Sequence, residues 1–172
     1  MFNLVKPDIS LREKFINMVN DYSDNNENIF NNDYFNTDFD YEGYIKDLDD
    51  LSNGVGLPEG YVPSTEWWLV NITNDILGTV RLRHKLGERN FQEGGHIGYD
   101  ISPRYRKKGY GKIILELVLY KAKELELEKV LITCDFDNIG SRRIIEQNGG
   151  KLENSIISNQ TGKEVLRYWI EL

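Results

Sequence analysis

A short basic stretch that contains two glycines carries the clearest chemical signal in this sequence. Its residues are Arg106, Lys107, Lys108, Gly109, Tyr110, Gly111 and Lys112. A helix that begins near Gly109 presents unpaired backbone N–H groups at its positive end, and the neighbouring cations strengthen that field. Glycines also let an anion come close to the backbone. The stretch therefore predicts a site for a phosphate-bearing ligand.

Two well-known phosphate-binding loops do not fit this stretch. A Walker A loop has serine or threonine directly after Gly-Lys, where this chain has Ile113. A dinucleotide-binding fingerprint needs a third glycine, where this chain has Ile114. The spacing that remains is R-x-x-G-x-G, preceded by a predicted strand and followed by a predicted amphipathic helix.

Two motifs together resemble a known family. The predicted strand, Ser102-Pro103, R-x-x-G-x-G and the apolar helix are similar to the acetyl-CoA-binding motif of the GNAT superfamily of N-acyltransferases. A second stretch, residues 138–149, resembles that family's N-x-x-S/A-x-x-L-Y-E-x-x-G-F. The matching positions are Asn138, Ser141, Glu146 and Gly149. On these two motifs the chain is identified as a member of the superfamily.

The elements that must position these motifs follow from hydrophobic periodicity and turn residues. Strands are predicted at residues 2–5, 67–72, 77–84, 96–102, 129–134, 151–157 and 164–171. Helices are predicted at residues 10–22, 41–51, 109–125 and 139–147, the first capped by Ser10 and Glu13. Residues 87–95 are expected to form a polar connection. The fold class is α/β with a mixed sheet in the order β-α-α-β-β-β-α-β-α-β-β, and residues 1–172 form one GNAT-like domain.

The resemblance implies acetyl-CoA as co-substrate and also implies the residues that bind it. In this family the pantetheine arm lies in a gap between the fourth and fifth strands, and the pyrophosphate rests on the basic loop. Carried over, the binding residues are Asp100, Ile101, Ser102, Arg106, Lys107, Lys108, Gly109, Tyr110, Gly111, Lys112, Asn138 and Ser141. Arg142 and Arg143 are expected near the 3′-phosphate, with a solvated helix face as the alternative for at least one of them.

The catalytic groups are less well defined than the cofactor loop. The tyrosine that the family often uses to protonate the leaving thiolate is replaced by Ile145, and Tyr168 is the substitute candidate. For the base, His96 and Asp100 share one face of the fourth strand, and an imidazole has the more suitable unperturbed pKa. His84, Glu66 and a water chain without a dedicated base are the alternatives.

The expected activity is transfer of an acetyl group from acetyl-CoA to a primary amine. Residues 21–50 contain ten acids and one base, and they include several aromatic residues. Acids and aromatic rings suit a cationic ligand, so a small cationic amine is the expected acceptor. A CoA-binding sensor or scaffold without turnover is the alternative, and a different acyl-CoA or a protein N-terminus is the third hypothesis. Family members often dimerise, so a homodimer is also considered.

Composition argues against several other classes of function. The net charge of −7 disfavours nucleic acid as a partner. No apolar stretch approaches the roughly 20 residues that span a bilayer, and the first residues lack a signal-peptide pattern. Cys134 is the single cysteine and is expected to be buried, with covalent catalysis as the alternative. No cluster has metal-ligand spacing, and a cytoplasmic location is expected.

Overall fold

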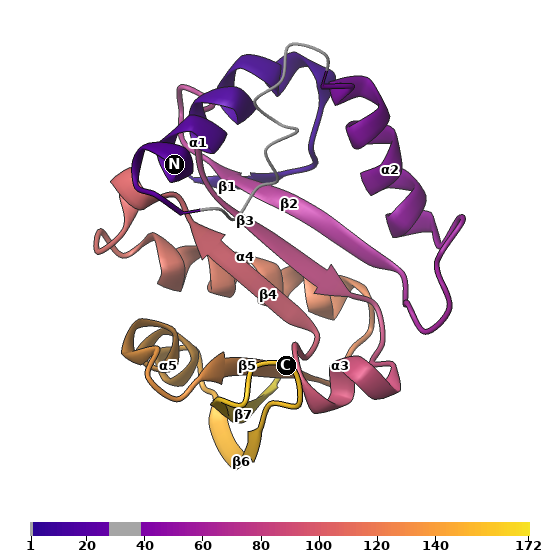
Figure 1. The fold of residues 1–172 in the computed structure, drawn as a ribbon, viewed down its shortest axis with the longest axis vertical. Coiled ribbons are helices and arrows are strands. Elements are labelled where there is room, and N and C mark those ends of the chain that lie inside the picture. The colour runs from indigo at the N-terminus through magenta and orange to yellow at the C-terminus, as the bar shows by residue number, and fades with distance from the viewer. Residues whose placement is uncertain (1, 28–38) are drawn as a thin grey trace.

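The structure, a computed structural model, describes residues 2–27 and 39–172 (Figure 1). Its elements are β1 (Asn3–Val5), η1 (Ile9–Leu11), α1 (Arg12–Asp24), α2 (Tyr41–Asn53), β2 (Ser64–Val70), β3 (Ile76–Arg83), α3 (Glu88–Gln92), β4 (Ile97–Ile101), η3 (Pro103–Tyr105), α4 (Tyr110–Glu124), β5 (Lys129–Asp135), α5 (Ile139–Gln147), β6 (Lys151–Ile157) and β7 (Glu164–Glu171). The predicted α/β order is confirmed, with three short helices added to it.

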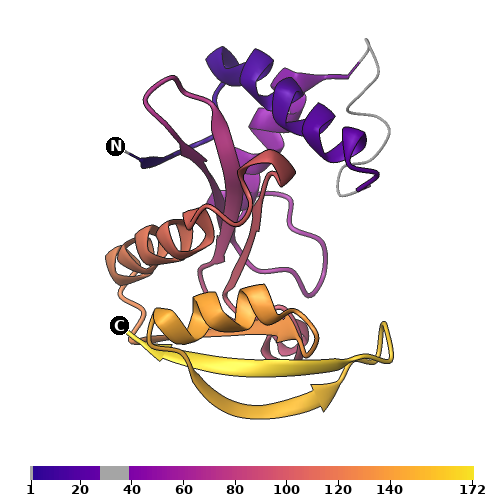
Figure 2. The ribbon, with the colours of Figure 1, turned by 90° about the vertical axis from the view of Figure 1, so that its left-hand side faces the viewer.

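The strands form two separate sheets. One is antiparallel in the order β1-β2-β3-β4, and the other is antiparallel in the order β5-β7-β6. In the first sheet Val80 lies opposite Tyr99, and Arg81 lies opposite Gly98. The second sheet lies beyond the free edge of β4, where Figure 2 shows it below the first. The family-implied gap between the fourth and fifth strands therefore coincides with the boundary between the sheets.

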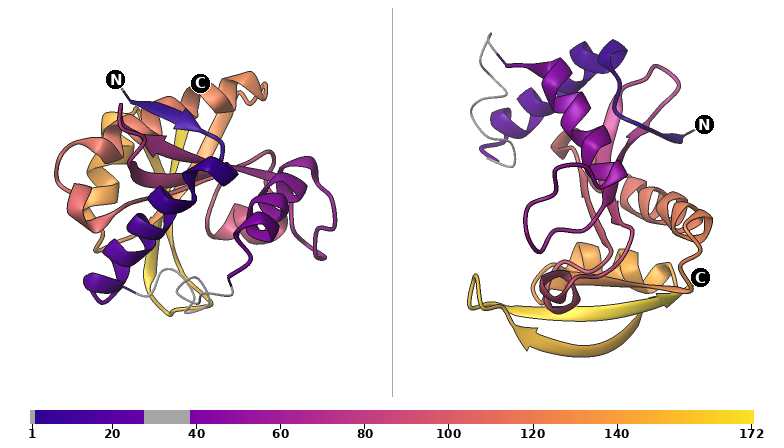
Figure 3. Two further views of the ribbon diagram at one scale, coloured as in Figure 1. Left: turned by 90° about the horizontal axis from the view of Figure 1, so that it is seen from above. Right: turned by 90° about the vertical axis from the view of Figure 1, so that its right-hand side faces the viewer.

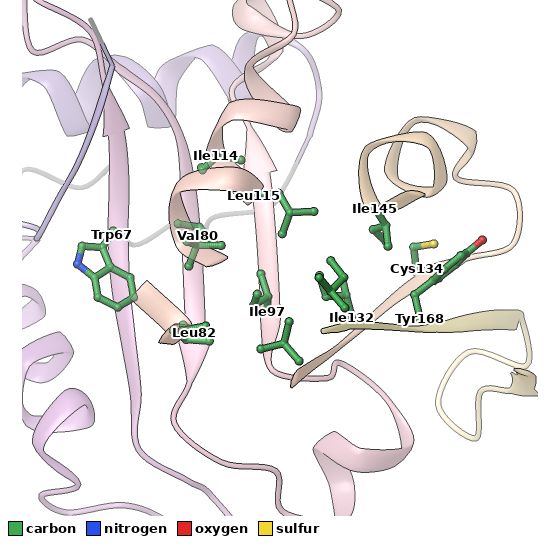
Figure 4. Close-up of a cluster of buried hydrophobic side chains, with 14 of the residues drawn as sticks. Trp67, Val80, Leu82, Ile97, Ile114, Leu115, Ile132, Cys134, Ile145 and Tyr168 are labelled. Atoms are coloured by element: carbon green, nitrogen blue, oxygen red, sulfur yellow. The ribbon is translucent and has the colours of Figure 1, made fainter. Parts of the chain in front are cut away.

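Helices cover the two faces of the first sheet. On one face α1 and α2 bury a cluster that includes Phe15, Tyr22 and Trp68. On the other face α4 buries Ile114 and Leu115 against β3, β4 and the second sheet (Figure 4). Figure 3 shows the pair α1 and α2 on the side opposite to α4. Alternate strand residues therefore point toward α4 or toward the face covered by α1 and α2, which we call the α1–α2 face.

Several predicted details of the chain were wrong. Asp8 caps the short helix η1, which leads into α1, and its carboxylate accepts from the Ser10 N–H at 2.9 Å. The predicted Ser10–Glu13 capping box therefore does not form. The second strand begins at Ser64 instead of Trp67, because it pairs with β3 as far as Arg83. Residues 87–95 contain the helix α3, which is too short to show a periodic pattern.

Candidate functional site

The two sheets are joined at the start of β4. The His96 N–H donates to the Leu131 carbonyl at 2.7 Å, and the Leu131 N–H donates to His96 Nδ1 at 2.9 Å. The Gly94 N–H also donates to Thr133 Oγ1 at 3.0 Å. From Ile97 onward, no β4–β5 pairing occurs in the part of the chain that the structure describes. The strands thus touch at one end and separate at the other.

A cavity of about 810 Å³ lies where β4 and β5 have separated. It is bounded by the second half of β4, the loop before α4, the first turn of α4 and the exposed side of α5. Its lining residues are Tyr99, Asp100, Ile101, Tyr105, Arg106, Lys107, Gly109, Tyr110, Gly111, Lys112, Asn138, Gly140, Ser141, Arg143, Ile144 and Gln147. The cavity brings together ten of the twelve cofactor residues expected from the sequence, all except Ser102 and Lys108.

The loop before α4 leaves a row of donors unused. Lys107 has φ +60° and Gly109, the N-cap of α4, has φ +87°. Within residues 2–27 and 39–172, the backbone N–H groups from Lys107 to Gly111 have no hydrogen-bond acceptor. The next two N–H groups, those of Lys112 and Ile113, donate to the Gly109 carbonyl. Consecutive unpaired N–H groups at a helix N-terminus form a concave anion site.

The absence of a side chain at Gly111 leaves the backbone open to an anion and also lets α5 pack closely against α4. It is buried in the first turn of α4, and a Cβ there would lie 2.5 Å from Ile144 Cδ1 on α5. Any side chain at this position would push apart the two helices that border the cavity.

We expect Gly111→Ala to destabilise the protein by about 1–3 kcal/mol, because the added methyl overpacks the α4–α5 contact. Ile144→Val removes the Cδ1 atom that the new methyl would meet. The double variant should therefore recover most of the lost stability, measured by chemical unfolding. If the double variant instead loses the sum of the stabilities lost in Gly111→Ala and in Ile144→Val, this explanation is contradicted.

Arg106 lines the cavity, but its charge is already engaged by carboxylates. Its Nε donates to the Ile101 carbonyl at 2.7 Å, and its guanidinium forms a bidentate ion pair with Glu27. It also lies 3.3 Å from an Asp100 carboxylate oxygen, so its pKa is raised, chiefly by the Glu27 hydrogen bonds. The residue fastens the loop to the end of α1, which is a structural role.

The cations that line the cavity are therefore a different set from the one suggested by the motif. Lys108 bonds the Arg104 carbonyl at 2.8 Å and lies outside the cavity lining. Lys107, Lys112 and Arg143 line it together with Arg106. Arg142 lies elsewhere, with its guanidinium over the Phe136 ring. Of the two arginines expected near a 3′-phosphate, Arg143 is the one on the cavity.

The backbone groups at the free edge of β4 come only in part from the expected residues Asp100, Ile101 and Ser102. The Ser102 N–H donates to Leu77 on β3, and its hydroxyl donates to buried Asp21. Backbone N–H and C=O groups alternate in direction along a strand. Those of Asp100 and Ser102 therefore point toward β3, whereas those of Tyr99 and Ile101 point into the gap between β4 and β5. Ser102 is also fully buried. The structure thus places Ser102 outside the cavity and brings in Tyr99, which the sequence motifs did not indicate.

Three polar side chains from three elements meet inside the gap. The hydroxyls of Tyr99 on β4 and Ser141 on α5 lie 3.0 Å apart. Burial raises the pKa of Tyr99 to about 12. The buried Cys134 thiol of β5 has a raised pKa because of burial, and a hydrogen bond with Ser141 partly offsets that effect. Asn138 caps α5 by accepting from the Ser141 N–H at 3.0 Å, which fixes the start of that helix.

The two expected catalytic residues have other roles in the structure. His96 links the sheets through Nδ1, so its neutral ring carries the proton on Nε2 and neither nitrogen is available as a base. Burial lowers the pKa of His96 to about 4, with the charge of Arg83 adding to the effect. The Tyr168 hydroxyl donates to Glu146 at 3.1 Å from within the core, beside Ile145 (Figure 4). Neither residue lines the cavity.

The alternative bases are also engaged. His84 Nε2 lies 2.8 Å from Thr65 Oγ1, and burial lowers the pKa of this histidine. Glu66 accepts from Arg81 at 2.7 Å and from the Trp68 ring N–H at 3.1 Å. Asp100 is the remaining carboxylate on β4, and it accepts from the Tyr22 hydroxyl at 2.6 Å on the α1–α2 face.

In the acidic and aromatic segment, two of the acids and three of the aromatic rings among the described residues are engaged in other contacts. Asp21 pairs with Arg104 at 2.9 Å, and Asp50 pairs with Lys46 at 2.5 Å. The aromatic rings of Tyr22, Tyr41 and Tyr44 belong to the cluster under α1 and α2. Phe30, Asp33, Tyr34, Phe35 and Asp38 lie outside the described residues.

Neither a membrane-spanning helix nor a metal-binding cluster occurs in the described ranges. None of the helices in residues 2–27 and 39–172 is long and apolar enough to cross a membrane. In the same ranges no three side chains of His, Cys, Asp or Glu gather into a metal site.

Sequence comparison gives two matches. The family model of the acetyltransferase (GNAT) domain matches residues 34–151. The chain is also similar to YnaD of Bacillus subtilis strain 168, an uncharacterised N-acetyltransferase, at 29% identity over 79 residues. That match covers 45% of this chain and 44% of YnaD, so it spans less than half of that relative's length.

Solved structures share the fold at low sequence identity. MccE, a microcin C7 self-immunity acetyltransferase in complex with acetyl-CoA and AMP, aligns with a TM-score of 0.71 at 17% identity, over 99% of this chain and 92% of that one. RimL is an α-N-acetyltransferase of ribosomal protein L7/L12, solved with coenzyme A disulfide-bonded to a cysteine. It aligns with a TM-score of 0.71 at 15% identity, over 99% of this chain and 94% of that one. SpeG, a spermidine/spermine N-acetyltransferase from Vibrio cholerae, aligns with a TM-score of 0.65 at 13% identity, over 99% of this chain and 95% of that one. RimL and SpeG act on different acceptors, so the shared fold leaves the acceptor open.

Proposed function

Because the chain belongs to the GNAT acetyltransferase family, we propose that it transfers the acetyl group of acetyl-CoA to a primary amine, which attacks the thioester directly. The observation that carries this proposal is the row of unpaired N–H groups from Lys107 to Gly111 beside the 810 Å³ cavity. With Lys107, Lys112 and Arg143 around it, this row suits a ligand with a diphosphate and a further phosphate.

Acetyl-CoA supplies an acetyl group that is already activated as a thioester. The loop N–H groups hold the diphosphate, and Arg143 holds the 3′-phosphate. The backbone groups of Tyr99 and the N–H of Ile101 face the gap and pair with the pantetheine amides, as an added strand would, while the Ile101 carbonyl already accepts from Arg106. An N–H of this edge also polarises the thioester carbonyl.

Proton transfer to the leaving thiolate is assigned to the Tyr99–Ser141 pair. Both hydroxyls line the cavity, and they lie 3.0 Å apart. The raised pKa of Tyr99, about 12 because of burial, keeps its phenol protonated at neutral pH. This pair takes the place of the family's tyrosine, whose position is occupied by the buried Ile145.

The acceptor amine approaches from the α1–α2 face of β4. It arrives as an ammonium ion, because the pKa of an alkylamine is near 10. Asp100 on that face attracts the ammonium, and a water chain carries its proton away. The cationic amine group expected from the sequence draws its support from Asp100, which lies on this face although it also contacts Arg106 at 3.3 Å.

We expect Arg143→Gln to weaken acetyl-CoA binding by about tenfold, since it removes a charge-assisted contact to the 3′-phosphate. Binding of 3′-dephospho-CoA should change little. Arg142→Gln is the matched control, because the neighbouring arginine lies outside the cavity lining. Calorimetric titration of both ligands into both variants gives the comparison, and equal losses for the two ligands would refute the assignment.

The proposed function is tested by combining this calorimetry with an assay of thiol release from acetyl-CoA and a panel of amines. Binding together with amine-dependent thiol release is the expected result. Binding without release for any amine would favour a CoA-binding sensor or scaffold, the function suggested by Ile145 in place of tyrosine. Absence of acetyl-CoA binding would overturn both functions.

A further inference from the structure

A second cavity, of about 410 Å³, lies at the opposite end of β4 from the basic loop. It is enclosed by the end of β3, helix α3, the loop before β2 and the β6–β7 turn; α3 marks its place in Figure 1. The residues that line it are Leu51, Gly60, Tyr61, Val62, Ser64, Arg81, Arg83, Arg89, Asn90, Glu93, Gly94 and Gln160.

Three arginines in this cavity outnumber its single carboxylate. Glu93 is occupied, because its oxygens accept from the Ser158 hydroxyl at 2.8 Å and from the Asn159 N–H at 3.0 Å. Arg81 pairs with Glu66, but its side chain remains 44% exposed. In a chain of net charge −7, this concentration of positive charge is unexpected.

Two of the arginines lack a carboxylate partner among residues 2–27 and 39–172. The Arg83 guanidinium donates only to the carbonyls of Gly94 and Gly95, at 3.2 and 3.0 Å, among the residues that the structure describes. The Arg89 guanidinium has no hydrogen bond or ion pair to any residue in those same ranges. Burial lowers the pKa of Arg83, and the charges of Arg81 and Arg89 add to that effect. The three guanidinium groups therefore repel one another, and a bound anion would relieve this repulsion.

The cavity opens beside the part of β4 where the amine must reach the thioester. Arg81 lies directly opposite Gly98 in the sheet register. Gly98 is exposed although it belongs to a strand, and a Cβ there would meet nothing within 4 Å. The next residue, Tyr99, lines the cavity assigned to acetyl-CoA. The backbone of β4 at Gly98 is thus open from the α1–α2 face, the same face to which Arg81 and Arg83 point.

We propose that the acceptor amine also carries a phosphate or carboxylate, and that Arg81, Arg83 and Arg89 seat this anionic group. The inference rests on the proposed function, because it identifies the class of acceptor for the same reaction. Guanidinium groups bind either anion through paired hydrogen bonds. With the anion in the arginine cavity, the amine end of the molecule extends along β4 toward Gly98 and Asp100. A polyamine without an anionic group would be repelled by the same arginines.

The test compares small amines that differ in charge. O-Phosphoethanolamine and 3-aminopropanoate carry a phosphate and a carboxylate, whereas ethanolamine and 1,4-diaminobutane carry neither. Thiol release from acetyl-CoA gives kcat/KM for each amine. We expect at least one of the two anionic amines to exceed both others by about tenfold or more, and their ratio shows which anion is preferred.

Arg89→Gln should remove most of that preference by raising KM for the anionic amine, while kcat and acetyl-CoA affinity stay unchanged. Lys85→Gln is the control, since it removes one positive charge from an exposed residue outside the cavity lining. Inorganic phosphate should compete with the anionic amine and not with acetyl-CoA.

Two results would overturn the inference, and they are distinguishable. The anion site is refuted, while the acetyltransferase function stands, if two results occur together. They are a kcat/KM for ethanolamine or 1,4-diaminobutane equal to that of the anionic amines, and an unchanged KM for the anionic amine in Arg89→Gln. If acetyl-CoA binds but no amine of the wider panel releases thiol, the proposed function fails and the inference fails with it.

Discussion

Gly109→Asp is expected to weaken acetyl-CoA binding by about a hundredfold, the largest effect on affinity that we anticipate. The new carboxylate would stand among the N–H groups that we assign to the diphosphate, where it repels the ligand and competes for the same donors. Losing two charge-assisted hydrogen bonds, at about 1.5–3 kcal/mol each, accounts for a loss of this size. Calorimetric titration with acetyl-CoA measures it.

Gly149→Asp provides a closely matched control. Gly149 ends α5 with the same φ of +87° as Gly109, and a Cβ at either position would meet nothing within 4 Å. Both variants therefore impose the same left-handed backbone strain of about 1–2 kcal/mol. Only Gly109 lies in the loop of unpaired donors. Equal losses of acetyl-CoA affinity in the two variants would show that strain, and not the anion site, causes the effect.

Tyr99→Phe should lower kcat by about a hundredfold while leaving acetyl-CoA affinity unchanged, because the variant loses the hydroxyl that protonates the leaving thiolate. Burial holds the pKa of Tyr99 near 12, so the acidic form predominates at every pH below that value. The activity of the wild type should therefore show no decline from this group until the pH approaches 12. Steady-state kinetics of thiol release provide both measurements.

Tyr168→Phe separates this assignment from the one suggested by the sequence. The Tyr168 hydroxyl donates to Glu146 inside the core and does not line the cavity. We expect the variant to keep its kcat and to lose about 1 kcal/mol of stability with that hydrogen bond. A large loss of kcat in Tyr168→Phe with little change in Tyr99→Phe would reverse the two roles.

The loop before α4 was predictable as a helix N-terminus because the residues that form it are adjacent in the chain. The two glycines, the surrounding lysines and the apolar helix are adjacent in the chain, so their spacing indicates a helix N-terminus that binds anions. The structure confirms that α4 begins directly after Gly109. Arg106 shows the limit of this reasoning, since its partner Glu27 is 79 residues away in the chain and engages the guanidinium in an ion pair.

The catalytic assignments depended on contacts that sequence spacing does not encode. His96 has a suitable intrinsic pKa, but a hydrogen bond from Leu131 across the sheet boundary occupies its Nδ1. Tyr99 gave no signal in the sequence, because a tyrosine in a strand usually indicates packing. Its distance of 3.0 Å to Ser141 exists only after β4 and α5 are brought together.

Periodicity, glycine spacing and the order of elements thus specified the family, the α/β order and the anion-binding loop, all of which depend on residues close in sequence. Folding specified the boundary between the sheets, the open backbone at Gly98, and the grouping of Arg81 and Arg83 with Arg89. These features combine side chains from separate elements, and their charges and hydrogen bonds depend on distances in space. The acceptor site that we propose belongs to this second group: the local excess of acids suggested a purely cationic amine, whereas the arginine cavity supports an amine that also carries an anionic group.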